Sequence, residues 1–331
     1  MRLEQLRRTL LEQNLEAILI SGAENRRYLS GFTGSAGHLL ITADRAVLAT
    51  DFRYYEQVGR EAGAFELARV TTTMAALLPE LLARDGIRRL GFESEHLTVA
   101  ELQTLTAAAA GVEWLPLKET VARLRAVKDE AEIERLRRSA ALNDDAYAHL
   151  TRVVRPGMTE REAAWEIEVY MRTHGAAKVA FDLIVAAGPN GALPHARPGE
   201  AVIQPGQPVV VDMGCVLDGY CSDMTRTFCL GEPGAHYLEV WHVVLRAQEA
   251  ALGAIRAGIS GVAADAAARD VIQAAGYGEQ FGHGLGHGVG LAVHEQPRAG
   301  RLSEDTLGAG MSLTVEPGIY LPGRFGVRLE D

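Results

Sequence analysis

Apolar positions in the first 118 residues switch between helical and strand-like spacing. Leu3, Leu6, Leu10 and Leu11 follow the helical period. Apolar runs predict further elements: a buried strand over 16–21, two strands of a hairpin over 38–42 and 46–50, helices over 74–82 and 98–110, and a strand over 90–93. Helices and strands that alternate in this way predict a small α/β domain.

A highly charged stretch separates these elements from the rest of the chain. Residues 117–138 are dense in Lys, Arg, Asp and Glu. This pattern is typical of an exposed helix with ion pairs along its surface, and it fits a solvated connector between domains equally well. We therefore expect two domains, spanning residues 1–120 and 121–331.

The second half of the chain carries a weak internal repeat. Residues 155–159 (RPGMT) and 256–260 (RAGIS) are Gly turns that lead to a Ser or Thr helix cap. A helix rich in Glu and Ala follows the first turn, and an Ala-rich helix follows the second. Strands are predicted after each copy, over 181–185 and 208–212 and then over 311–316. Helices followed by runs of strands predict an α+β domain with helices packed on a curved antiparallel sheet.

Composition narrows the classes of function. The 331 residues include 33 Lys and Arg against 43 Asp and Glu, a formal net charge of −10, which argues against nucleic acid or a membrane surface as the main partner. No uncharged apolar run reaches the roughly 18–20 residues that cross a bilayer, and the charged first helix is unlike a secretory signal. Three cysteines are too few for a disulfide framework, which favours a cytoplasmic location.

A predicted hairpin over 209–228 brings two acids together. Asp218-Gly219 is the dipeptide of a type I′ turn, which places Gly214 opposite Asp223 and Asp212 opposite Thr225. Asp212 and Asp223 then share one face, and Gly214 leaves space over the sheet. Two inward-facing carboxylates need a compensating cation. From the hairpin alone, a metal site and the alternative, carboxylates that face solvent or pair with Arg, are equally favoured.

Further acids and histidines favour the metal. The Gly-rich segment 281–290 carries His283 and His287, and His294 follows. The segment lacks the spacing and the Lys of a phosphate loop, so we expect its glycines to allow close approach to a ligand. Glu316 and Glu330 each end an apolar run. Four carboxylates and one imidazole form a hard, oxygen-rich donor set that suits Mn²⁺, Co²⁺ or Zn²⁺ in a paired site: Asp212, Asp223, His287, Glu316 and Glu330.

The whole chain resembles the M24 metallopeptidases, which have the pita-bread fold, and within them the proline-specific branch of aminopeptidase P and Xaa-Pro dipeptidase (prolidase). Residues 25–35 (NRRYLSGFTGS) resemble the creatinase-like N-terminal domain of that family, and residues 127–133 (VKDEAEI) its interdomain helix. The five donor residues follow the order and spacing of the family's metal ligands. This resemblance implies an α+β pita-bread catalytic domain with an internal pseudo-two-fold repeat, preceded by a smaller α/β domain.

The resemblance also implies an activity. It implies a metal-dependent exopeptidase that hydrolyses the Xaa-Pro bond at the N-terminus of short proline-containing peptides, with two divalent ions (Mn, Co or Zn) per chain that activate water. Chain-length preference stays open, with aminopeptidase P slightly favoured over the alternative, a prolidase restricted to dipeptides. A catalytically silent peptide-binding relative and a creatinase-like amidinohydrolase are weaker alternatives.

Roles for individual residues come from the same resemblance. Asp212 binds one metal and His287 the other, Asp223 and Glu330 bridge both, and Glu316 is a ligand and the proton shuttle. The remaining implied residues surround the substrate: His195 and His294 near it, His283 lining the pocket, and Arg298 and Arg328 holding its carboxylate or carbonyl groups. The resemblance further implies a homodimer and a natural chain that continues beyond Asp331.

Overall fold

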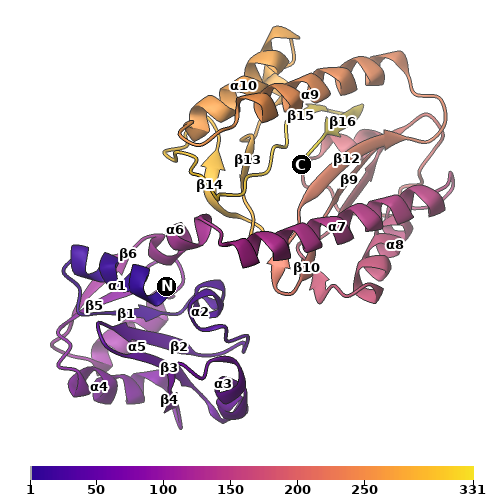
Figure 1. The fold of residues 1–331 in the computed structure, drawn as a ribbon. Coiled ribbons are helices and arrows are strands. Elements are labelled where there is room, and N and C mark those ends of the chain that lie inside the picture. The colour runs from indigo at the N-terminus through magenta and orange to yellow at the C-terminus, as the bar shows by residue number, and fades with distance from the viewer. Residues whose placement is uncertain (1) are drawn as a thin grey trace. The chain divides into compact units, whose positions relative to one another are not determined.

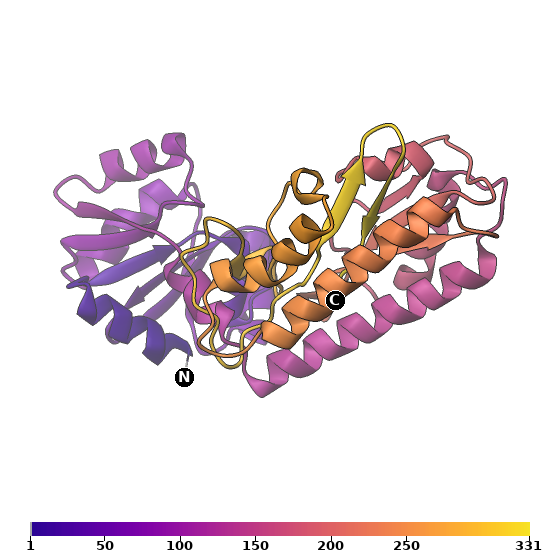
Figure 2. The ribbon, with the colours of Figure 1, turned by 90° about the horizontal axis from the view of Figure 1, so that it is seen from above.

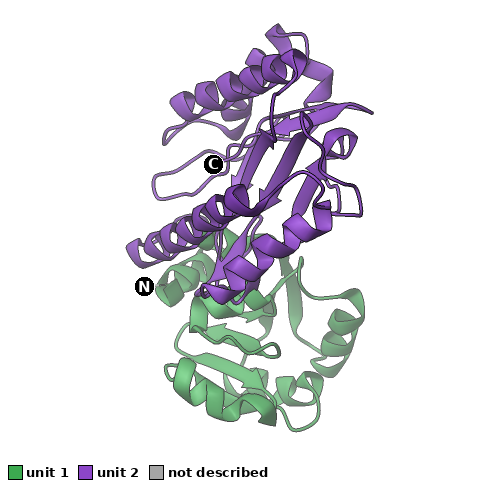
Figure 3. Ribbon diagram, turned by 90° about the vertical axis from the view of Figure 1, so that its right-hand side faces the viewer, with its two compact units in different colours: residues 1–125 green, residues 126–331 purple. Residues whose placement is uncertain are grey.

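The computed structural model describes residues 2–331 and divides the chain after Arg125 into two compact units (Figure 3). Unit 1 comprises residues 1–125 and unit 2 residues 126–331. The division falls at the end of helix α6 (Thr120–Ala126), a few residues after the boundary expected from the charge pattern.

Unit 1 is a mixed six-stranded sheet with helices, as the apolar pattern predicts. The strand order is β4-β3-β2-β1-β5-β6, with the predicted β2–β3 hairpin antiparallel and β1–β5, β5–β6 and β3–β4 parallel. All four residues of β1 are buried, so both faces of the sheet are covered at its centre. Its elements are α1 (Arg2–Glu12), β1 (Ala17–Ile20), α2 (Ala23–Ser30), β2 (His38–Thr42), β3 (Ala46–Thr50), the 3₁₀ turn η1 (Phe52–Tyr54), α3 (Tyr55–Glu61), β4 (Glu66–Arg69), α4 (Met74–Arg84), β5 (Arg89–Glu93), α5 (Val99–Ala108), β6 (Glu113–Leu117) and α6.

Unit 2 consists of two halves, each a pair of helices followed by strands (Figure 1). Figure 2 shows α7 as a single long helix along this unit. The first half contains α7 (Glu130–Val153), α8 (Glu160–Thr173), β7 (Lys178–Val179), β8 (Ile184–Ala187), η2 (Gly188–Ala192), β9 (Pro208–Met213), β10 (Cys215–Leu217), β11 (Tyr220–Cys221) and β12 (Met224–Cys229). The second half contains α9 (Ala235–Ala254), α10 (Gly261–Ala274), η3 (Gly278–Gln280), β13 (Gly286–Gly288), β14 (Glu295–Ala299), β15 (Gly318–Leu321) and β16 (Phe325–Arg328).

The internal repeat is visible at the start of the second helix of each half. Thr159 caps α8 in a capping box with Glu162, and Ser260 caps α10 by accepting a hydrogen bond from the amide of Ala263. Gly157 and Gly258 precede the caps with φ of 94° and 90°, a conformation that favours glycine. Both predicted Gly turns with their caps are therefore confirmed.

Each half packs its helices over its own strands and has its own apolar core. The two halves meet where β12 lies beside β16 and the residues after it. The hydroxyl of Thr227 donates to the carbonyl of Arg328 and accepts from its amide, and the amide of Glu330 donates to the carbonyl of Thr225. Two small cores are thus joined by polar contacts between edge residues, with Glu330 among them.

Two predicted strands differ from the observed ones. The strand predicted over 181–185 is shifted to 184–187. The run 311–316 forms no regular strand. In a β-ladder the amide of His287 would donate to a backbone carbonyl of this run, but here it donates to the side-chain hydroxyl of Thr314. Among residues 2–331, no helix has both the length and the apolar character that crossing a membrane requires.

The capping box of α8 gives a test of the fold. We expect Thr159→Ala to destabilise unit 2 by about 1 kcal/mol, because the first turn of α8 loses its side-chain acceptor. Denaturant unfolding followed by circular dichroism measures this. The matched control is Thr151→Ala near the end of α7, where the exposed hydroxyl bonds only to the carbonyl of Ala148 and Ala is the better helix former. An equal loss in both variants would contradict the capping assignment.

Candidate metal centre and active site

The β9–β12 hairpin has the register that its turn residues predict. Asp218 and Gly219 have φ of 50° and 86°, as a type I′ turn requires. Leu217 lies opposite Tyr220, and Thr225 lies opposite Asp212. Asp212 and Asp223 consequently line the same cleft.

Gly214 has a different role from the one expected. We expected it to leave space over the sheet. The carbonyl of Ser222 and the ring of Phe181 occupy that space instead, and a Cβ at Gly214 would collide with both. The glycine therefore allows the hairpin to close tightly beside Asp223.

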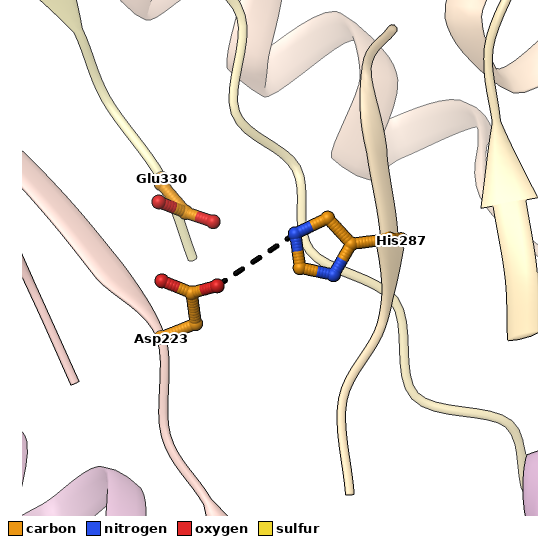
Figure 4. A group of neighbouring side chains, drawn as sticks. All are labelled: Asp223, His287 and Glu330. Atoms are coloured by element: carbon orange, nitrogen blue, oxygen red, sulfur yellow. Dashed lines mark ion pairs between the residues drawn. The ribbon is translucent and has the colours of Figure 1, made fainter. Parts of the chain in front are cut away.

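Asp223, His287 and Glu330 converge from three segments of unit 2 (Figure 4). Their ligand atoms lie within 4.8 Å of one another. Nε2 of His287 is 3.6 Å from Oδ2 of Asp223 and 3.4 Å from Oε1 of Glu316. The hydroxyl of Thr225 donates to Oε2 of Glu330 at 2.7 Å and fixes that carboxylate. Oxygen and nitrogen donors grouped in this way can surround a small divalent cation.

Arg328 holds Asp212 at the edge of this group. Its NH2 donates to Oδ2 of Asp212 at 2.6 Å, and its NH1 and Nε donate to the hydroxyls of Tyr320 and Thr225. The buried guanidinium of Arg328 is thus engaged by protein groups, and its expected contact with substrate stays a prediction. Among the described residues, the buried Oδ1 of Asp212 has no hydrogen-bond partner, which leaves one carboxylate oxygen for a cation.

Burial shifts the protonation of the whole group. It raises the pKa of Glu316 to about 7 and also raises the pKa of Asp212. The pKa values of Asp223 and Glu330 stand well above their usual range, because of burial first and of the neighbouring carboxylates next. Burial lowers the pKa of His287 to about 4 and keeps its ring neutral, as a metal ligand must be. A bound cation would relieve this crowding of acids, so the residues present fit a metal site.

The Gly-rich segment brings His287 next to Glu316. The amide of Thr314 donates to the carbonyl of His287 at 2.7 Å, and the amide of Glu316 donates to the carbonyl of Leu285 at 2.9 Å. A Cβ at Gly286 would collide with the carbonyl of Thr314. Gly286 thus admits a neighbouring segment of the protein. The expected approach of a ligand stays a prediction for Gly282, where no atom lies within 4 Å of an added Cβ.

Arg269 of α10 holds the beginning of the same segment. Its guanidinium pairs with the buried Asp265 at 2.7 Å and donates to the carbonyls of Phe281 and His283 at 2.8 and 2.7 Å. Nε2 of His283 is 2.9 Å from the hydroxyl of Tyr320, and burial lowers the pKa of His283 to about 4. His283 is therefore a neutral ring in a fixed position.

A cleft of about 1310 Å³ in unit 2 contains the whole group. His294 and Arg298 are exposed, and the ring centroid of His294 is 4.3 Å from that of His287. Among residues 2–331, the guanidinium of Arg298 has no ion-pair or hydrogen-bond partner. All ten residues predicted for the site line the cleft: His195, Asp212, Asp223, His283, His287, His294, Arg298, Glu316, Arg328 and Glu330.

The sequence analysis missed residues that hold the site in place. Thr225 had a detectable signal, because the predicted register already placed it opposite Asp212. Arg269 and Tyr320 had none: a basic residue in a helix and an aromatic residue in a strand are ordinary, and only their tertiary neighbours give them a role.

Comparison with known proteins identifies the family. Residues 134–331 match the model of metallopeptidase family M24, and residues 2–127 match the Creatinase/Prolidase N-terminal domain. The chain belongs to metallopeptidase family M24. The expected family and the expected fold class, an M24 catalytic domain behind a creatinase-like α/β domain, are both confirmed. Members of family M24 that are metallopeptidases use divalent metals, in agreement with the donor set in the cleft.

Several relatives of known structure cover nearly the whole chain. An Xaa-Pro dipeptidase from Bacillus anthracis is 41% identical, with a TM-score of 0.97, over 100% of this chain and 93% of that one. An X-Pro aminopeptidase from Thermotoga maritima is 37% identical, with a TM-score of 0.91, over 100% of this chain and 94% of that one. In sequence, an Xaa-Pro dipeptidase from Pyrococcus horikoshii is 36% identical over 97% of this chain and 90% of that protein.

The close approach at Gly286 gives a test of the site. We expect Gly286→Ala to weaken Mn²⁺ binding at least tenfold and to lower stability by about 1–3 kcal/mol, because the added methyl group separates Thr314 from His287. Isothermal titration with Mn²⁺ and thermal unfolding measure the two effects. The matched control is Gly253→Ala on the exposed side of α9, where no atom lies within 4 Å of the new methyl group and stability rises by about 1 kcal/mol. Wild-type Mn²⁺ affinity in Gly286→Ala would refute this account of the site.

Proposed function

We propose that this protein is a metal-dependent exopeptidase that hydrolyses the Xaa-Pro bond, with dipeptides as its preferred substrates. The observation that carries the proposal is the convergence of Asp223, His287 and Glu330 in the cleft. The relatives from Bacillus anthracis and Pyrococcus horikoshii are both named Xaa-Pro dipeptidases, which supports dipeptides as substrates. The sequence had slightly favoured aminopeptidase P, with the dipeptidase as the alternative. The Thermotoga maritima relative bears the aminopeptidase name and keeps longer peptides as the second candidate.

The proposed cofactor is a pair of divalent ions, Mn²⁺, Co²⁺ or Zn²⁺. The donor set is rich in oxygen and holds no thiolate, in keeping with these ions in a catalytic site. Asp212 would hold one ion and His287 the other, with Asp223 and Glu330 between them and Glu316 completing the set. Bound there, such ions lower the pKa of water and polarise a peptide carbonyl.

The side chains around this set would handle protons and orientation. Glu316 lies 3.4 Å from His287 and can accept the proton of the attacking water and deliver it to the proline nitrogen, which leaves as a secondary amine. His294 faces the cleft beside His287 and can stabilise the oxyanion that develops on the scissile carbonyl. His195 lines the cleft on a loop whose Pro194 carbonyl accepts a hydrogen bond from Arg328.

Arg298 is the proposed determinant of chain length. A dipeptidase must bind the carboxylate of a C-terminal proline, and the planar guanidinium of Arg binds a carboxylate through two hydrogen bonds. Arg298 lines the cleft, and its side chain pairs with no described residue. Arg328 cannot replace it, because its NH2 is occupied by Asp212.

Metal removal tests the activity. Exhaustive chelation should abolish hydrolysis of Ala-Pro and lower the Tm, because an ion that binds only the native state stabilises it by about 2.7 kcal/mol at a concentration 100 times Kd. Glu316→Gln should lower kcat by roughly 10²–10⁴-fold, the usual contribution of a positioned acid or base, while the Tm stays within a few degrees. Glu304→Gln, an exposed change outside the cleft, is the control and should behave as wild type. Full activity after chelation, or in Glu316→Gln, would exclude the proposal.

Substrate length tests the choice between the two candidates. The wild type should cleave Ala-Pro at least tenfold faster, by kcat/KM, than Ala-Pro-Ala. Arg298→Ala should lower kcat/KM for Ala-Pro by about 10–100-fold, since a hydrogen bond to a charged group contributes about 1.5–3 kcal/mol, and should change Ala-Pro-Ala little. Arg301→Ala, which removes another exposed arginine of the cleft, is the control. Preferred cleavage of Ala-Pro-Ala would favour the aminopeptidase.

A further inference from the structure

Lys128 and Glu295, both in unit 2, form a buried ion pair. Their side chains are 1% and 2% exposed, and Nζ of Lys128 lies 3.3 Å from Oε2 of Glu295. Desolvation of two charges offsets most of their attraction, so a buried pair adds little net stability over apolar residues of the same shape. This pair is therefore better explained by what it positions than by what it stabilises.

Glu295 is buried directly beside the exposed His294. Glu295 is the first residue of β14, and His294, in the bend before it, lines the cleft. The carboxylate also folds back over the loop that precedes it. Oε1 accepts a hydrogen bond from the amide of Ala292 at 2.9 Å, and a Cβ at Gly290 would collide with the carboxylate. Glu295 thus closes the loop 289–294 that ends in His294.

Lys128 provides a fixed support for this carboxylate. Its amide donates to the carbonyl of Gly310 at 2.9 Å, and the next residue, Asp129, caps α7 by accepting from the amide of Glu132. Val127 forms a β-bridge with Met311, in the segment that leads to Glu316. The backbone that carries this side chain is consequently held to the segment leading to Glu316 and continues directly into α7.

We propose that the buried Lys128–Glu295 pair is a positioning device that holds the loop 289–294 so that His294 contacts His287 at the wall of the cleft. The role of His294 in hydrolysis rests on the proposed function. The positioning itself rests on the ion pair, the Ala292 hydrogen bond and the near-perpendicular approach of the two rings, with centroids 4.3 Å apart.

The decisive variant is the double substitution Lys128→Met with Glu295→Met, which removes both charges and keeps apolar bulk in the buried space. Hydrogen exchange measured by mass spectrometry should show at least tenfold faster exchange in peptides covering 289–294, and unchanged exchange in peptides covering 311–316. With Ala-Pro as substrate, kcat should fall about tenfold, while KM and bound Mn²⁺ change less than twofold. Unchanged exchange over 289–294 would overturn the proposal.

Two further measurements separate positioning from general damage. In a His294→Ala background the double substitution should cost no further activity, because the pair acts through His294; losses that multiply would refute this. The control, Arg45→Met with Asp85→Asn, removes the ion pairs of Arg45 with Asp85 and Glu66 in unit 1 and should alter neither exchange over 289–294 nor kcat.

A milder variant covers the case in which the double substitution fails to fold. Glu295→Gln keeps an oxygen for the Ala292 amide and removes the charge, so it should give a smaller increase in exchange over 289–294. Wild-type exchange in this variant would count against a role for the charge pair. An inactive wild type would refute the proposed function. The hydrogen-exchange measurements need no substrate, so they would still test whether the Lys128–Glu295 pair holds the loop 289–294.

Discussion

The cost of burying negative charge governs the second unit of this protein. Asp212, Asp223, Glu316 and Glu330 line one cleft, and burial raises the pKa of each. Carboxylates in such proximity are stable in ionised form only beside compensating positive charge. Arg328 supplies one fixed positive charge, and the proposed metal ions supply the rest. Much of the surrounding structure exists to keep these acids in place.

That placement depends on backbone contacts more than on regular secondary structure. Thr314 and Glu316 lie in a segment without regular strand structure and are bound to the segment of His287 by individual hydrogen bonds. Gly286 and Gly214 permit approaches that any side chain would block. Arg269 then fixes the entrance of the segment through two carbonyl groups. Several individual hydrogen bonds therefore act together on the same short stretch of chain.

The sequence predicted those parts whose determinants are local. Asp218-Gly219 specifies its turn and hence the register that brings Asp212 and Asp223 together, and Thr159 specifies a helix start. The resemblance added the ligand order, and the cleft contains every residue it implied. The strand predicted over 311–316 was wrong, because a threonine hydroxyl replaces a ladder bond there. Lys128 could not be recognised, since its partner lies 167 residues away and a lysine before a charged helix normally faces water.

The contact between the two halves of unit 2 determines when the donor set of the cleft is complete. Asp212 and Asp223 belong to the first half, whereas His287, Glu316 and Glu330 belong to the second, and each half has its own core. A partly folded chain in which only one half has formed therefore possesses an incomplete donor set. The chain can therefore hydrolyse a substrate only after both halves have folded and docked, so activity requires the complete folding of unit 2.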